Sequence, residues 1–131
     1  MRAVILAALV ICTAAPAMAQ LGQKAPGAGS WHGTGFQVGP SGVQSSWTIE
    51  MIIGARNAAI AYPSLGCKSE LELALRTGAR AEYTETITEG DCITKGRITA
   101  IQENGRLFWF WTKPDIGADA SAVLYPDDQL S

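Results

Sequence analysis

Apolar and polar residues alternate along short segments of this chain from residue 33 onward, and Gly, Pro and Asn separate the segments. Alternation with a period of two is typical of β-strands, and no segment shows the period of an amphipathic helix. The expected strands are 33–38, 46–53, 58–62, 69–76, 79–88, 94–102, 106–112 and 121–125.

Several of these segments carry their large apolar residues on one face. In 46–53, Trp47 and Ile49 alternate with Thr48 and Glu50. In 69–76 the shared face holds Leu71, Leu73 and Leu75. One-sided alternation is typical of antiparallel sheets that have one face in water.

The connections favour hairpins between consecutive strands. Asn104-Gly105 is a strong signal for a two-residue hairpin, and residues 77–78 and 54–57 are plausible short turns. The sequence therefore predicts an all-β domain of about eight strands, either an antiparallel up-and-down barrel or a small sandwich. A barrel has the advantage that closure removes exposed strand edges.

The first residues have the layout of a secretory signal peptide. Arg2 precedes an apolar run over 3–15, and the small-residue pattern Ala17-Met18-Ala19 predicts cleavage after residue 19. The run is short for an uncleaved membrane anchor, and Ile11 is the wrong residue before Cys12 for a lipoprotein site. The expected organisation is a signal peptide at 1–19, a flexible arm at 20–32 and one β domain at 33–131, with periplasmic or secreted localisation.

Signal cleavage leaves two cysteines, Cys67 and Cys92. An even pair in an exported protein predicts a disulfide. Because one cysteine precedes strand 69–76 and the other follows strand 79–88, the bond should lock the open end of that hairpin. The absence of a C-x-x-C motif disfavours a redox role.

Charge narrows the range of partners. The formal net charge is −2, and cleavage would remove the basic Arg2, so nucleic acid is not an expected partner. No second apolar run reaches the length that spans a bilayer, so stable membrane insertion after signal cleavage is not expected.

The sequence contains no convincing catalytic or metal-binding motif. His32 is the only histidine, so neither a metal site nor a cofactor is expected. The glycines of 33–39 lack the spacing of a phosphate loop. Glu50 and Glu85 could act as a hydrolytic carboxylate pair, but alternation directs Glu50 outward, and no enzymatic activity is expected.

Glu85 is in phase with Tyr83 and Ile87, so its carboxylate should point into the domain. Buried carboxylates require hydrogen bonds or a charge partner. Two interpretations follow. Glu85 could accept hydrogen bonds from backbone amides of the loop at 90–92, or it could be the polar anchor of a ligand pocket.

The segment RLFWFW has aromatic residues on both faces of one strand. Trp109 and Trp111, together with Leu107, are expected in the core. Phe108 and Phe110 would then form an outward apolar patch of the kind that marks a contact site, unless the N-terminal arm or the segment at 119–125 covers it.

A set of motifs resembles a small bacterial extracytoplasmic β domain. These motifs are Y-P-S-L-G-C at 62–67, the E-x-I-x-x-G-x-C of 85–92, Gly96 and the L-x-W-x-W of 107–111; Lys68 departs from the expected glycine. Similar segments occur in short secreted proteins and in domains appended to larger sensor or protease chains. The resemblance implies export and a β fold, but no activity. The overall plan is also similar to the periplasmic lysozyme-inhibitor barrels, a likeness of architecture alone.

These observations favour a binding or accessory module that recognises a protein or cell-envelope partner through Phe108 and Phe110 or through a barrel mouth. One alternative is a lipocalin-like carrier of a small apolar ligand, whose interior would be lined by Trp47, Tyr83, Glu85 and Trp109. Another is a protein similar to the lysozyme inhibitors.

Overall fold

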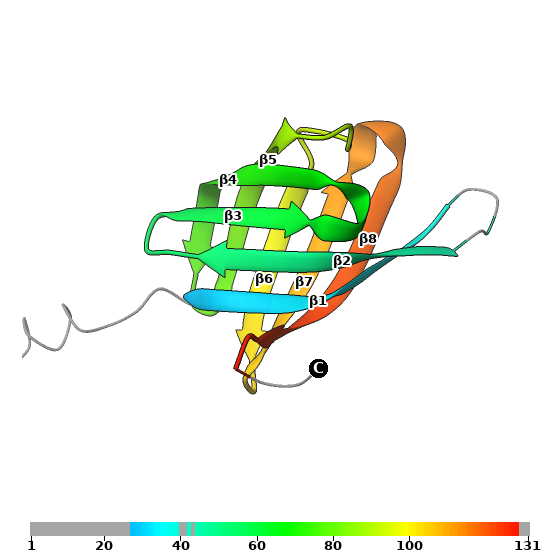
Figure 1. The fold of residues 1–131 in the computed structure, drawn as a ribbon. Helices are drawn as coiled ribbons and strands as arrows, with labels where there is room; N and C mark the ends of the chain where they lie inside the picture. The colour runs from blue at the N-terminus through cyan, green and yellow to red at the C-terminus, as the bar shows by residue number, and fades with distance from the viewer. Residues whose placement is uncertain (1–26, 40–41, 43, 129–131) are drawn as a thin grey trace, which may run out of the picture.

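Eight antiparallel strands close into an up-and-down barrel in which β1 pairs with β8 (Figure 1). The computed structural model describes residues 27–39, 42 and 44–128, so the predicted signal peptide and residues 20–26 of the predicted arm lie outside the described residues. The strands are β1 Gly29–Val38, β2 Gln44–Ile53, β3 Asn57–Tyr62, β4 Cys67–Thr77, β5 Arg80–Glu89, β6 Arg97–Glu103, β7 Arg106–Lys113 and β8 Ala118–Pro126. Two short 3₁₀ helices, η2 (Pro63–Leu65) and η3 (Pro114–Ile116), connect β3 to β4 and β7 to β8. The barrel is thus confirmed over the sandwich.

The N-terminal end of β1 differs from the prediction. The strand begins at Gly29, so the prediction of a flexible arm is wrong for residues 29–32. Trp31 pairs with Met51 of β2, and His32 pairs with both Glu50 of β2 and Tyr125 of β8. These two ladders extend β1 because the strand lies between two partners at this end.

The β2–β3, β4–β5 and β6–β7 turns lie at one end of the barrel, which we call the closed end. Gly27 is buried there, where an added Cβ would lie 3.2 Å from Ile53 and 3.3 Å from Leu107. The indole Nε1 of Trp31 donates to the carbonyl of Gly27 at 2.6 Å, and the amide of Gly27 donates to the side chain of Gln102 at 2.7 Å. The chain entering β1 therefore packs across this end.

The predicted hairpin at Asn104-Gly105 is confirmed. Both residues have positive φ, 53° and 77°, and Glu103 pairs with Arg106 across the turn. Two central residues with positive φ define the type I′ turn that matches the twist of antiparallel strands.

The barrel interior is packed with apolar side chains. The largest fully buried side chains are Trp109, Tyr83, Ile49, Met51, Ile98, Leu107, Leu124 and Glu85. Gly33 and Gly35 of β1 lie very close to atoms of the neighbouring strands. A Cβ at position 33 would lie 2.5 Å from the carbonyl oxygen of Val123, and a Cβ at position 35 would lie 3.0 Å from the Trp47 ring. These glycines are needed for packing between strands.

Leu75 does not share the inward face of Leu71. Leu75 is 51% exposed, because the pairing of β4 with β5 shifts register between Leu73 and Leu75. A β-bulge inserts one extra residue and reverses the alternation beyond it. The predicted apolar face of this strand is therefore wrong at its last position.

The predicted disulfide between Cys67 and Cys92 is present. It joins the first residue of β4 to the loop after β5, at the end of the hairpin opposite the turn between Thr77 and Arg80. Gly90 has a φ of 91°, and a Cβ there would lie 2.7 Å from the sulfur of Cys67. Only glycine fits at this position beside the disulfide.

No helical segment within the described part of the chain is both long enough and apolar enough to cross a membrane.

Replacing both bridged cysteines by alanine should destabilise the barrel strongly. In the chain-entropy model, opening the loop from Cys67 to Cys92 lowers the free energy of unfolding by about 3.5 kcal/mol. Urea unfolding of the Cys67→Ala/Cys92→Ala variant, with reduced wild type as the control, measures this difference. A loss below about 1 kcal/mol in both samples would contradict the role of the bond as a structural staple.

Candidate functional site

A pocket of about 300 Å³ opens at the barrel end opposite the closed end, and we call it the mouth pocket. Its lining combines residues of β1, β2, β3, β5 and β7 with residues of the connections at that end. The lining residues are Gln37, Ser45, Ser46, Trp47, Tyr62, Leu65, Glu85, Ile87, Asp91, Cys92, Ile93 and Trp111.

One wall of the mouth pocket is made by β2 and η2. Figure 1 shows β1 and β2 projecting beyond the neighbouring strands at this end, because β3 pairs with β2 only from Glu50 to Ile53. Beyond that point η2 takes the place of β3: the amide of Thr48 donates to Ser64 Oγ at 2.9 Å and the amide of Ser64 donates to Thr48 Oγ1 at 3.1 Å. This contact fixes η2, which carries Leu65, on the strand that carries Trp47.

The facing wall is the loop between β5 and β6. The disulfide fixes Cys92 of this loop to the start of β4. Two backbone hydrogen bonds of 2.9 Å fix its other end, from the amide of Glu85 to the carbonyl of Gly96 and from the amide of Lys95 to the carbonyl of Glu85. The loop is thereby held with Asp91 and Ile93 at the pocket.

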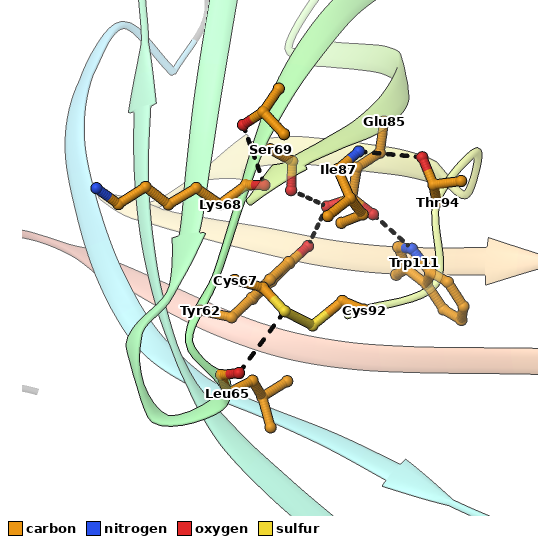
Figure 2. The surroundings of a disulfide bond; sticks show 11 residues. Tyr62, Leu65, Cys67, Lys68, Ser69, Glu85, Ile87, Cys92, Thr94 and Trp111 are labelled. Atoms are coloured by element: carbon orange, nitrogen blue, oxygen red, sulfur yellow. Dashed lines mark hydrogen bonds between the residues drawn. A yellow bond between two sulfur atoms is a disulfide. The ribbon is translucent and has the colours of Figure 1, made fainter. Parts of the chain in front are cut away.

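Glu85 is 1% exposed and accepts three side-chain hydrogen bonds from the described residues. Its Oε2 accepts from the hydroxyls of Tyr62 at 2.6 Å and Ser69 at 2.7 Å, and its Oε1 accepts from the indole Nε1 of Trp111 at 2.9 Å (Figure 2). The inward orientation predicted for Glu85 is confirmed. The prediction of backbone donors from the 90–92 loop is wrong, because side chains from β3, β4 and β7 converge on the carboxylate instead.

Burial controls the protonation of this cluster. Desolvation raises the pKa of Glu85 above its ordinary value of 4.5, while the hydrogen bonds from Tyr62, Ser69 and Trp111 act in the opposite direction. Desolvation also raises the pKa of Tyr62, and the charge and hydrogen bond of Glu85 raise it further. Tyr62 therefore remains a protonated donor to Glu85.

Aromatic rings continue from the mouth into the core. The Tyr62 ring lies edge-on to Trp47 at a centroid distance of 6.5 Å and to Trp109 at 6.4 Å. Such edge-to-face pairs are favourable beyond the area that they bury. The indole nitrogen of Trp47, on the pocket wall, is buried and has no hydrogen-bond partner among the described residues.

The structure divides the predicted site residues into three groups. Trp47 and Glu85 line the mouth pocket. Tyr83 and Trp109 lie deeper, with no exposed surface, in the packed core. Phe108 and Phe110 lie on the outer wall of the barrel.

The outer group extends across three strands. A hollow of about 500 Å³ lies on this wall, and we call its lining residues the outer patch. They are Gly33, Thr34, Phe36, Phe108, Phe110, Ser121, Ala122, Val123 and Tyr125. Phe36 is 47% and Phe110 is 45% exposed. The segment at 119–125 lies beside Phe108 and Phe110 as strand β8, in register through Val123 and Ser121, so it does not cover them.

The sequence interpretation did not identify Tyr62, Ser69 and Trp111 as partners of Glu85. Alternation contained part of this signal, since Tyr62 is in phase with the inward Ile60 and Ser69 with the inward Leu71. The loop residues Leu65 and Ile93 had no such signal, because their position depends on how η2 and the β5–β6 loop pack.

The remaining chemical candidates lie elsewhere. Glu50 is exposed on the outer face, as alternation predicted, and so does not converge with Glu85. His32 Nδ1 lies 3.1 Å from a carboxylate oxygen of Asp127 at the barrel surface. Within residues 27–39, 42 and 44–128, no group of three or more His, Cys, Asp or Glu side chains could hold a metal ion.

Gly96→Ala should disrupt the hydrogen bond between Trp111 and Glu85. An added Cβ at this buried glycine would overlap the Trp111 indole nitrogen, so we expect a loss of about 1–3 kcal/mol in unfolding free energy and a shifted Trp111 indole proton resonance. Gly54→Ala is the matched control, because its Cβ would be 3.3 Å from the nearest atom. Equal effects at the two positions would count against the steric requirement at Gly96.

Glu85 should make the barrel more stable in acid. Because the folded pKa of Glu85 is raised, the folded state binds more protons than the unfolded state above pH 4.5. The contribution of Glu85 to the free energy of unfolding is therefore fully present below pH 4.5. This contribution is lost as the pH rises through the folded pKa of Glu85, by up to about 1.4 kcal/mol per pH unit.

Urea unfolding between about pH 4 and 8 measures this slope in wild type and in Glu85→Gln. The two proteins share every other titrating group, so their difference in slope reports Glu85. Parallel pH profiles would contradict a raised pKa, whatever the absolute stability of the variant.

In comparisons with known proteins, no family model, no curated protein and no solved structure matches this chain.

Proposed function

We propose that this chain is a binding module that acts outside the cytoplasm and takes a small, partly apolar group into its mouth pocket. The observation that carries the proposal is the pocket itself, where a buried carboxylate lies among aromatic and aliphatic side chains. Ligand sites typically combine an apolar lining with a few fixed polar groups.

The position of the pocket favours a group that enters from the end of the barrel. Trp109 and Tyr83 fill the interior below it, so a ligand surrounded by the barrel, as in a lipocalin-like carrier, would have to displace the core. A pocket of about 300 Å³ suits a small molecule or one exposed group of a protein or cell-envelope component.

The disulfide supports the proposed location. A bond between Cys67 and Cys92 persists in oxidising compartments, which include the periplasm and the extracellular medium. The proposal assigns no catalytic role, because Glu50 is exposed on the outer face and does not form a carboxylate pair with Glu85.

The outer patch is a second candidate surface. Exposed Phe36 and Phe110 flank a hollow on the barrel wall, and exposed apolar patches often mark contact sites. A test of the proposal therefore has to separate the mouth from the wall.

We expect neutral aromatic probes such as benzyl alcohol to bind at the mouth. In two-dimensional NMR of the isotope-labelled protein, the indole resonances of Trp47 and Trp111 should shift, while that of Trp31 at the closed end should not. Ile93→Ser should weaken binding several-fold, because it removes exposed apolar surface at the pocket.

Ile116→Ser is the matched control, since Ile116 is equally exposed at the same end but does not line the pocket. Phe108→Ser/Phe110→Ser tests the outer patch in the same way. Binding that is lost in this double variant and kept in Ile93→Ser would move the site to the barrel wall. An absence of shifts with every aromatic probe, neutral or charged, at millimolar concentration would remove the mouth pocket as a binding site.

A further inference from the structure

We propose that the group bound in the mouth pocket is a small organic cation, an amine whose positively charged nitrogen donates to Oε1 of Glu85 while its apolar part contacts the aromatic rings. This inference rests on the proposed function, because it names the ligand class of the same pocket.

The first argument is the hydrogen-bonding capacity of Glu85. A carboxylate offers about four acceptor positions, and the described residues use three of them. Tyr62 and Ser69 both donate to Oε2, whereas Trp111 alone donates to Oε1. Glu85 lines the pocket although it is 1% exposed, so we assign the fourth acceptor position, on Oε1, to the ligand.

The second argument is charge. The three donors to Glu85 are the neutral side chains of Tyr62, Ser69 and Trp111, although buried carboxylates are usually paired with a cation. The described residues that line the pocket include a second acid, Asp91, but no Lys, Arg or His. A ligand that brings a positive charge would therefore complement the site.

The third argument is the aromatic lining. Trp47, Tyr62 and Trp111 surround the pocket, and Trp47 and Tyr62 lie edge-to-face. Aromatic side chains attract cations through their quadrupole, and most strongly when the contact is shielded from water. The same rings also accommodate the apolar part of an amine.

The ammonium group that the pocket binds has two possible sources, a free small amine or the side chain of a lysine on a protein. Both present a primary ammonium group on an apolar stem. Nα-acetyl-lysine methylamide represents the second source, and benzylamine represents the first.

The test compares benzylamine, benzyl alcohol and phenylacetate, which share an aromatic ring and differ in charge. Titrations at about pH 7.5, where an alkylamine keeps its proton, follow the indole resonances of Trp47 and Trp111, with Trp31 as the internal control. We expect benzylamine to bind about tenfold or more tightly than benzyl alcohol, and phenylacetate to bind more weakly than both.

Each outcome has a distinct meaning. Equal affinity for the amine and the alcohol would overturn the cation inference and leave the binding function intact, as would tighter binding of phenylacetate. No binding of any probe overturns both. If benzylamine binds as expected, tighter binding of the lysine derivative than of benzylamine identifies a protein side chain as the source, and weaker binding of the lysine derivative identifies a free amine.

Glu85→Gln assigns the selectivity to this carboxylate. The variant should bind benzylamine and benzyl alcohol about equally, because it removes the charge and keeps the size of the side chain. Glu50→Gln, which removes an exposed carboxylate from the outer face, should keep the wild-type preference. A preference for benzylamine that survives in folded Glu85→Gln would overturn the role of Glu85. If that variant does not fold, the probe series on the wild-type protein still decides the inference.

Discussion

A carboxylate inside a packed barrel is stable only when its oxygens are hydrogen-bonded, and this requirement organises the mouth of the molecule. Glu85 of β5 meets it with donors from three other strands, Tyr62 of β3, Ser69 of β4 and Trp111 of β7. Removing Trp111 would leave Oε1 without a partner among the described residues in a low-dielectric site, which costs about 1–3 kcal/mol. The cluster therefore couples strands that are not all neighbours in the barrel, and it fixes the side chains around the mouth pocket relative to one another.

The disulfide and two glycines maintain the geometry of this cluster. The bond from Cys67 to Cys92 and the backbone contacts of Lys95 and Gly96 with Glu85 hold the β5–β6 loop at both ends. Gly90 leaves room for the disulfide, and Gly96 leaves room for the Trp111 indole. Tyr62, Cys67, Glu85, Cys92 and Trp111 thus come together around the disulfide, although they are spread from residue 62 to residue 111 of the sequence (Figure 2).

Alternation predicted most of the barrel because it is a local property of each strand. It placed Trp109 and Leu107 in the core and Phe110 outside, and it directed Glu85 inward. It was wrong at Leu75, where a bulge in the pairing of β4 with β5 reverses which side chains point inward. The predicted flexible arm was wrong from Gly29 onward, because pairing with β2 and β8 extends β1 to that residue. The site was less predictable than the fold, since its donors and its loop residues meet only through closure of the barrel.

The two ends of the barrel differ in a way that bears on function. At the closed end, Gly27 packs on apolar side chains and satisfies the indole of Trp31, so the chain itself completes that surface. At the mouth, an open pocket is lined by Glu85, whose donors are the neutral side chains of Tyr62, Ser69 and Trp111. An apolar pocket with one fixed polar group is typical of ligand sites. The open pocket therefore favours the mouth as the place of binding, and the neutral donors around Glu85 favour a ligand that carries positive charge.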